Sequence, residues 1–302
     1  MKVAIFGLGG VGGYFAAQAS HYFKGREDIE FYYIARGEHL KAIKRDGLRL
    51  KRDQGEDIIA HPKMATDNPS DCGVVDYLVY ATKSYSIDEN IESIRAITDK
   101  NSVIVTFMNG VDGAEKLRAA LPDVTIVEGC VFIYSYILSS GVIVESGDFA
   151  QYQIGGESQG AKEFFSLFEP AIDRLTFNED VMKKIWGKFS YISPFATVAT
   201  QYNITSGEIV GTPKYNNIYH ALCDEFEAVV KALGVELGFN VYEENIAIVA
   251  RLPEDSTCSM QRDYHSGKMC EYESLSGYIS RKGSELGIPT PQYDKAARYF
   301  LS

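Results

Sequence analysis

The feature that most restricts how this chain can fold is a run of glycines close to its N-terminus. Residues 7–12 read Gly-Leu-Gly-Gly-Val-Gly, directly after an apolar stretch at residues 2–6 and at the start of a helical pattern over residues 10–23. Between a strand and a helix, the first glycine permits a tight turn, the second lets the backbone approach a pyrophosphate, and the third allows close helix–strand packing. The unpaired N–H groups and the positive dipole end of such a helix favour phosphate.

We therefore predict that this turn binds a dinucleotide, with a glycine-rich packing turn that holds no ligand as the alternative. The residues expected to contact the cofactor are Gly7, Leu8, Gly9, Gly10, Val11 and Gly12. The same glycines argue against a secretory signal, because they interrupt the apolar core that such a signal requires.

The rest of the first half alternates short apolar runs with helical patterns. Strands are expected at residues 2–6, 31–35, 76–81, 103–107, 125–127, around 131–138 and at 142–145. Helices are expected at residues 10–23, 39–45, 87–97 and 114–121, and a polar hairpin or excursion at residues 48–60. Alternation of β-branched runs with helices predicts an α/β Rossmann-type domain, whose mostly parallel sheet carries helices on both faces.

The second half is dominated by helical patterns. An amphipathic helix is expected at residues 162–175, followed by long helices at residues 181–200, 216–233 and 272–286. Apolar residues at helical spacing carry these assignments, and Gly287 and Pro289 end the last helix. We predict a dinucleotide-binding domain over residues 1–178 and an all-α second domain over residues 179–302.

The residue at the end of the second expected strand selects the form of the cofactor. An NAD site places Asp or Glu there to hold the ribose 2′-hydroxyl, whereas this chain has Arg36. A guanidinium pairs with phosphate oxygens through two parallel hydrogen bonds, which fits a 2′-phosphate. Arg36 therefore predicts NADP(H), and a solvated arginine at a strand end is the alternative.

Two polar residues follow the third and fourth expected strands. Lys83 comes after residues 76–81, and Asn109 comes after residues 103–107. Ligands bind at the carboxyl ends of the strands in such sheets, so both side chains are candidates for cofactor contacts, and Asn109 also for substrate. Loop Lys and Asn are common on surfaces, so the pattern alone leaves a plain surface position equally open.

Lys188 and Glu271 are the candidates for chemistry in the second half. Lys188 shares a helical face with Lys184 and lies in an aromatic neighbourhood that includes Trp186 and Phe189. A partly buried lysine in a cleft can act as a general acid, and a solvated basic stripe is the alternative. Glu271 opens a helix, where a carboxylate is also favourable for electrostatic reasons alone.

Composition excludes several other classes of function. A formal net charge of −11 disfavours nucleic acid as a partner, and no apolar run reaches the roughly 20 residues needed to cross a bilayer. Five scattered cysteines without a C-x-x-C pair, and five scattered histidines, predict free thiols and no metal site. A cytoplasmic protein without nucleic-acid or membrane partners is expected, and a homodimer is compatible with the sequence.

Taken together, the segments resemble the ketopantoate reductase (2-dehydropantoate 2-reductase) family over nearly the whole chain. The matching motifs are GLGGVGG at 7–13, IARGEHL at 34–40, ATKSY at 81–85, MNGV at 108–111, IWGKF at 185–189, STCSMQRDYHSGKMCEYESLSG at 256–277 and LGIPTP at 286–291. The segment at 256–277 is the most specific of these, because a generic dinucleotide-binding fold does not explain it.

The resemblance implies a role for each matching residue. Gly7, Gly9 and Gly12 match the pyrophosphate turn, Arg36 the 2′-phosphate contact, and Lys83 and Asn109 the lining of the cofactor and substrate cleft. Lys188 matches the catalytic lysine that protonates the substrate carbonyl oxygen. Glu271 matches the acidic residue that binds the substrate hydroxyl, and Ser259 matches a serine that helps bind the substrate carboxylate.

The chain departs from the family pattern at two positions. The family has asparagines four and eight residues after the catalytic lysine, where this sequence has Ile192 and Ala196. The expected activity is NADPH-dependent reduction of 2-dehydropantoate to pantoate, for pantothenate and coenzyme A. The substitutions keep open an NADP-dependent reductase of another 2-oxo acid, opine-type or related, because pocket hydrogen bonds carry much of the discrimination between substrates. A non-catalytic NADP-binding redox sensor is a further alternative.

Overall fold

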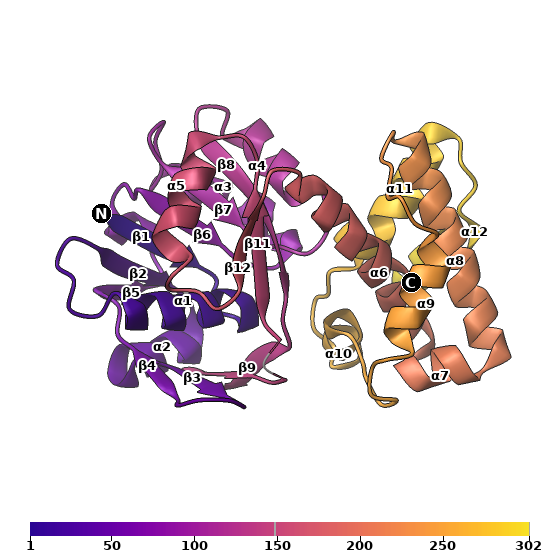
Figure 1. Ribbon diagram of the computed structural model, residues 1–302, viewed down its shortest axis with the longest axis horizontal. Coiled ribbons are helices and arrows are strands. Elements are labelled where there is room, and N and C mark those ends of the chain that lie inside the picture. The colour runs from indigo at the N-terminus through magenta and orange to yellow at the C-terminus, as the bar shows by residue number, and fades with distance from the viewer. Residues whose placement is uncertain (148, 302) are drawn as a thin grey trace. The chain divides into compact units, whose positions relative to one another are not determined.

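The computed structural model describes residues 1–147 and 149–301 (Figure 1). The chain folds into two compact units. Unit 1 consists of Met1–Met108 and Asp112–Met182, and unit 2 of Asn109–Val111 and Lys183–Ser302. The predicted domain limits, 1–178 and 179–302, stay a prediction.

Unit 1 is built around an eight-stranded sheet with the order β12-β11-β8-β7-β6-β1-β2-β5. Its strands are β1 Lys2–Phe6, β2 Glu30–Ile34, β5 Met64–Thr66, β6 Tyr77–Tyr80, β7 Val103–Thr106, β8 Thr125–Phe132, β11 Gln151–Gly155 and β12 Leu175–Asn178. All neighbouring strands run parallel except β11 and β8, which pair antiparallel. The mostly parallel sheet that the sequence predicts is therefore confirmed.

Helices cover both faces of this sheet (Figure 1). The side chains on both faces of its central strands are therefore buried. Along β1, Val3 and Ile5 belong to the core that contains α1 Gly10–Tyr22 and α5 Gln159–Phe168. Ala4 and Phe6 belong to the opposite core, with α3 Ile87–Arg95 and α4 Gly113–Ala120. The alternation of side chains along a strand explains this division.

A second, four-stranded sheet has the order β4-β3-β10-β9 and packs on α1. β3 Leu48–Arg52 and β4 Ile58–Ala60 form the hairpin predicted at residues 48–60. β9 Ser135–Ser139 and β10 Val142–Glu145 form another hairpin, and β10 pairs parallel with β3. α2, at Gly37–Asp46, precedes β3 in the chain.

Two expectations for unit 1 were wrong in detail, and three strands were not predicted. The strand expected around residues 131–138 is divided, since β8 continues to Phe132 and β9 begins at Ser135. The helix expected at residues 162–175 ends at Phe168, two residues before Pro170, which disfavours a continued helix, and the chain enters β12 at Leu175 after Arg174 takes a positive φ of 55°. The strands that were not predicted, β5, β11 and β12, lack a clear apolar pattern in the sequence.

Every regular element that the structure describes in unit 2 is helical. The helices are α6 Val181–Tyr202, α7 Ser206–Gly211, α8 Pro213–Ala232, α9 Val241–Val249, α10 Ser259–His265, α11 Tyr278–Leu286 and α12 Pro291–Phe300. The helix expected at residues 272–286 is α11 preceded by a π-helical turn, η3, at Glu273–Gly277. The all-α prediction for the second half is confirmed, although α7, α9, α10 and α12 were not foreseen.

The helix that carries Lys188 contains a proline, and a residue from another helix compensates for it. Pro194 lies inside α6 and has no N–H to donate to the carbonyl of Ser190, one turn earlier. A buried carbonyl without a donor is costly. The amide of Asn245 in α9, which is buried, donates to this carbonyl at 2.7 Å. One side-chain hydrogen bond thus replaces the missing bond of α6 and attaches α9 to it.

We expect Asn245→Ala to lower the free energy of unfolding of unit 2 by about 1–3 kcal/mol, since it leaves the Ser190 carbonyl unsatisfied. The loss should be smaller in a Pro194→Ala background, where the new N–H can bond Ser190. Urea unfolding of the four proteins of this double-mutant cycle tests the coupling. The fluorescence of Trp186, the single tryptophan, reports on unit 2. Equal losses in the two backgrounds would contradict the assignment.

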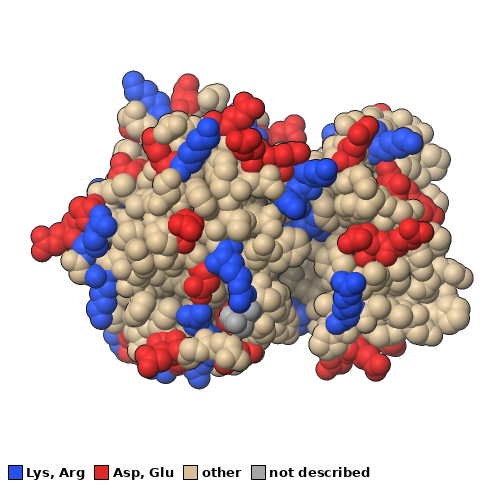
Figure 2. Space-filling model, viewed as in Figure 1, with Lys and Arg blue, Asp and Glu red and all other residues tan. Residues whose placement is uncertain are grey.

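No helix among residues 1–147 and 149–301 is both long enough and apolar enough to cross a membrane. On the face shown in Figure 2, Lys and Arg side chains are interspersed with Asp and Glu over both units.

Candidate functional site

The glycine turn of unit 1 joins β1 to α1, and each of its glycines meets a different steric environment. Gly7 has a φ of 101°, which favours glycine, and a Cβ there would lie 2.8 Å from the carbonyl oxygen of Ala81. A Cβ on Gly12 would collide with the carbonyl oxygen of Gly7. A Cβ on Gly9 would meet nothing within 4 Å. The turn is thus tight at Gly7 and Gly12 and open at Gly9.

The N-terminus of α1 is electrostatically suited to an anion. Its N-cap is Gly9, which offers no side chain to cap the first N–H groups, and its first turn contains no acidic residue. The first N–H groups of a helix lack intrahelical partners, and the helix dipole places positive potential there. The backbone of residues 9–12 can therefore donate to phosphate oxygens without displacing a side-chain cap.

Arg36 follows β2 and serves as the N-cap residue of α2, with an exposed side chain. Its Nη2 donates to Oδ1 of Asn90 at 3.3 Å, and the buried Asn90 in turn donates to the hydroxyl of Tyr80 at 3.1 Å. This chain of hydrogen bonds restricts the guanidinium while leaving its other N–H groups for a ligand. The sequence analysis missed Asn90, because nothing in the sequence links a residue of α3 to the end of β2.

Lys83 follows β6, which lies between β1 and β7 in the sheet. This half-buried residue is the N-cap of the short 3₁₀ helix η2, Ser84–Ser86. Because β1 and β6 run parallel, their carboxyl ends lie at the same edge of the sheet, so Lys83 and the glycine turn occupy this edge. The assignment of Lys83 to the cofactor stays a prediction.

Asn109 brings Lys188 and Glu271 together within unit 2. The ammonium of Lys188 donates to Oδ1 of Asn109 at 2.9 Å. Nδ2 of Asn109 faces Oε2 of Glu271 at 3.4 Å. The carboxylate of Glu271 is buried, with 3% of the residue exposed, whereas Lys188 and Asn109 are half-buried. The cluster thus combines an ammonium group, an amide and a carboxylate at the rim of a buried region.

The segment that carries Glu271 is attached to α6 by buried hydroxyl groups. Ser193 in α6 donates to the carbonyl of Leu275 at 2.7 Å, and the hydroxyl of Thr197 lies 2.7 Å from the hydroxyl of Ser276. Leu275 and Ser276 belong to η3, and π-helical turns are frequent at functional sites. These bonds fix η3, and with it the adjacent Glu271, against the helix that holds Lys188.

Two tyrosines beside the cluster residues do not act as bases at neutral pH. Burial raises the pKa of Tyr191, in α6, to about 12. Burial also raises the pKa of Tyr272, which follows Glu271, to about 12. Both phenols therefore stay protonated in the physiological range.

The remaining predicted substrate residues lie on α10 and α6. Ser259 is the first residue of α10 and is half-buried. Ile192 and Ala196 follow Lys188 by one and two turns of α6, with Ile192 half-buried and Ala196 buried. The face of α6 beyond Lys188 is therefore apolar at both positions where the resemblance implies asparagine.

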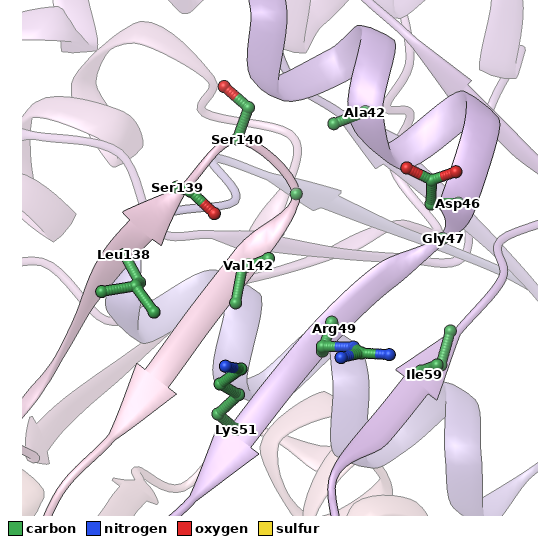
Figure 3. Close-up of a pocket in the computed structure, with 11 residues that line it drawn as sticks. Ala42, Asp46, Gly47, Arg49, Lys51, Ile59, Leu138, Ser139, Ser140 and Val142 are labelled. Atoms are coloured by element: carbon green, nitrogen blue, oxygen red, sulfur yellow. The ribbon is translucent and has the colours of Figure 1, made fainter.

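A hollow of about 320 Å³ lies elsewhere, on the second sheet of unit 1 (Figure 3). Its lining comes from the end of α2, from β3 and β4, and from the turn between β9 and β10, and includes Asp46, Arg49, Lys51, Ser139 and Ser140. None of the predicted site residues contributes to it. Among the described residues, no group of His, Cys, Asp and Glu side chains is arranged to hold a metal ion, and Cys72, Cys223 and Cys258 are free thiols.

The fold, together with the family matches given next, defines a pyridine-nucleotide-dependent oxidoreductase that acts on a CH–OH/ketone pair. The family model for ketopantoate reductase PanE/ApbA matches residues 3–158, and the model for the C-terminal part of the same family matches residues 180–298. The chain belongs to the ketopantoate reductase family.

Similar proteins cover the chain almost completely. A 2-dehydropantoate 2-reductase of Mesorhizobium japonicum is 26% identical over 97% of this chain and 95% of the relative. An oxidoreductase of Bacillus subtilis, YkpB, is 26% identical over 96% of this chain and 95% of its own length. The crystal structure of 2-dehydropantoate 2-reductase from Porphyromonas gingivalis is 28% identical, with a TM-score of 0.86 over 100% of this chain and 99% of that one.

Because Gly9 and Gly12 have different surroundings, a methyl group should affect nucleotide binding at Gly9 and stability at Gly12. Gly12→Ala should lower the free energy of unfolding of unit 1 by about 1–3 kcal/mol, because its Cβ meets the Gly7 backbone. Gly9→Ala should leave stability unchanged and weaken nucleotide binding, since its methyl group occupies the space of the expected pyrophosphate. Thermal unfolding by circular dichroism and titration with NADPH separate the effects. A stable Gly12→Ala variant would refute the close packing.

Proposed function

We propose that this protein reduces 2-dehydropantoate to pantoate with NADPH, a step toward pantothenate and coenzyme A. The observation that carries the proposal is the cluster of unit 2, in which Asn109 contacts both Lys188 and Glu271. Family membership supports reduction of a 2-oxo acid. Lys188 supplies a proton, and Glu271 supplies an acceptor for a substrate hydroxyl, which 2-dehydropantoate carries.

The residues of unit 1 suit the cofactor that the proposal requires. The open space at Gly9 and the uncapped N-terminus of α1 suit a pyrophosphate, and Arg36 suits a 2′-phosphate. Lys83 adds positive charge at the same sheet edge. When bound, NADPH supplies the hydride that reduces the substrate carbonyl carbon.

The proposed roles of the residues in unit 2 follow from their chemistry. The carbonyl oxygen of the substrate accepts a hydrogen bond from the ammonium of Lys188, which polarises the carbonyl group. As the carbon gains a hydride, Lys188 transfers a proton to the oxygen, and the neutral amine later regains a proton from water. Asn109 orients the ammonium. Glu271 accepts from the substrate hydroxyl and Ser259 donates to its carboxylate, which fixes the carbonyl for attack.

Ile192 and Ala196 support a second candidate, the reduction of another 2-oxo acid of opine type or a related kind. Both side chains are apolar, so the substrate pocket loses two hydrogen-bonding groups relative to the family pattern. The cluster of Lys188, Asn109 and Glu271 argues against the third candidate, an NADP-binding redox sensor, because a sensor does not require a proton donor and a substrate-binding carboxylate. A homodimer and a cytoplasmic location belong to the proposal, the latter supported by five scattered cysteines without a C-x-x-C pair.

A panel of 2-oxo acids with NADPH and NADH separates the three candidates. The proposal expects the highest kcat/KM for 2-dehydropantoate with NADPH, measured as the loss of reduced nicotinamide absorbance. A higher kcat/KM for a 2-oxo acid without a hydroxyl group would favour the second candidate. Tight NADPH binding without turnover of any acid would favour the sensor.

Lys188→Ala should reduce kcat by about 10²–10⁴-fold, the typical contribution of general acid catalysis, with NADPH affinity nearly unchanged. Lys184→Ala is the matched control, because Lys184 is exposed one turn earlier on α6 and should be dispensable. An active Lys188→Ala enzyme would remove this lysine from the chemistry.

Arg36→Ala should raise the Kd for NADPH by about 10- to 100-fold, the value of a charge-assisted hydrogen bond to phosphate, and change the Kd for NADH little. Asn90→Ala should show the same preference more weakly, since Asn90 only restricts the guanidinium. Equal losses for both cofactors would exclude a 2′-phosphate role for Arg36.

A further inference from the structure

Three carbonyl groups of the glycine turn accept hydrogen bonds from side chains of distant segments. His39 Nε2, in α2, lies 2.9 Å from the carbonyl oxygen of Leu8. The hydroxyl of Ser135, at the start of β9, donates to the carbonyl of Gly10 at 3.2 Å. The buried hydroxyl of Tyr152, in β11, donates to the carbonyl of Val11 at 2.7 Å. All three donors and the turn belong to unit 1.

Because the peptide bond is planar, a side chain that holds a backbone carbonyl of the turn also restricts the direction of the next backbone N–H group. In a trans peptide, the carbonyl of one residue and the N–H of the next lie in one plane and point in opposite directions. A side chain that fixes the Leu8 carbonyl therefore fixes the N–H of Gly9. In the same way, Ser135 fixes the N–H of Val11, and Tyr152 fixes the N–H of Gly12.

These three N–H groups lie where the pyrophosphate of the cofactor is expected. We propose that His39, Ser135 and Tyr152 are positioning residues that orient the N–H groups of Gly9, Val11 and Gly12 toward the pyrophosphate of a dinucleotide. The inference rests on the proposed function, which assigns a dinucleotide to this turn. The side chains hold the turn from the side of its carbonyls and leave its N–H groups to the ligand.

His39 has a second contact that makes it central among the three. The backbone N–H of Gly141, in the turn between β9 and β10 that borders the hollow of Figure 3, donates to Nδ1 of His39 at 3.0 Å. Nδ1 is thus the acceptor, so the proton of the neutral ring is on Nε2, which donates to Leu8. His39 connects the second sheet to the glycine turn through one imidazole ring.

The surroundings of His39 keep the ring in this state. Burial lowers the pKa of His39, although the contact with the Leu8 carbonyl partly opposes the shift. A neutral ring accepts at one nitrogen and donates at the other, whereas a protonated ring would direct an N–H at the N–H of Gly141. The neutral form therefore preserves both contacts.

Close packing restricts the turn from the same side. A Cβ on Gly10 would collide with the carbonyl oxygen of Ser135, so β9 lies directly against the turn. The second sheet also packs along α1. The turn is held by steric contact as well as by hydrogen bonds, which reduces the cost of ordering it when the cofactor binds.

Titration of His39 variants with two ligands tests the inference. NADP⁺ contains the pyrophosphate, whereas adenosine 2′-monophosphate contains only the phosphate expected at Arg36. His39→Ala should raise the Kd for NADP⁺ roughly tenfold, about the value of one hydrogen bond, and change the Kd for adenosine 2′-monophosphate less than about twofold. In steady-state assays, the KM for NADPH should rise while kcat stays within about twofold of the wild-type value.

Amide variants separate the two contacts of the ring. His39→Gln can place its Nε2 as the donor to Leu8 and should retain most of the affinity for NADP⁺. His39→Asn can only accept from Gly141 and should resemble His39→Ala. His21→Ala is the matched control, because His21 is exposed near the C-terminal end of α1. This variant should bind both ligands with wild-type affinity.

The possible outcomes are distinct. Unchanged NADP⁺ affinity in His39→Ala, or an equal loss for both ligands in a folded variant, would overturn the inference while leaving the proposed function intact. If His39→Ala does not fold, Ser135→Ala and Tyr152→Phe take its place, and normal NADP⁺ binding by both would overturn the inference. A wild-type protein that binds neither nucleotide would refute the proposed function and the inference together.

Discussion

The proposed chemistry depends on the two hydrogen bonds made by the side-chain amide of Asn109. An amide accepts at its oxygen and donates at its nitrogen, so Asn109 can contact the ammonium of Lys188 and the carboxylate of Glu271 at once. An aspartate could serve only the lysine, and a leucine neither. The amide nitrogen also offsets part of the cost of placing the carboxylate of Glu271 in the interior.

The scaffold of unit 2 preserves this geometry through polar bonds in its interior. The hydroxyls of Ser193 and Thr197 hold η3 against α6, and Asn245 supplies the donor that Pro194 lacks. Unit 1 also uses polar contacts, since side chains far apart in the sequence contact the carbonyls of its glycine turn. In both units, directional hydrogen bonds orient the groups to which we assign a function, while apolar packing holds the elements together.

The sequence predicted those features that depend on local patterns. The limits of β1 and α1 were expected almost to the residue, because a buried strand and a glycine turn leave few alternatives. β11 was missed since its sequence, QYQIG, mixes polar and apolar residues although it is almost entirely buried. The helix expected at residues 162–175 continued an apolar pattern across the turn at Arg174. Local context made Lys188, Asn109 and Glu271 candidates and the family resemblance gave them roles, whereas Asn90 and His39 make long-range contacts that no local pattern reveals.

The most direct test of the central claim is the fate of the hydride. The purified protein would be incubated with 2-dehydropantoate and NADPH carrying deuterium at C4, in separate reactions for the two stereoisomers of the label. We expect pantoate with one deuterium at C2 from one stereoisomer and none from the other, as mass spectrometry would detect. Pantoate without deuterium from both, or no pantoate at all, would contradict a direct reduction by NADPH on this protein.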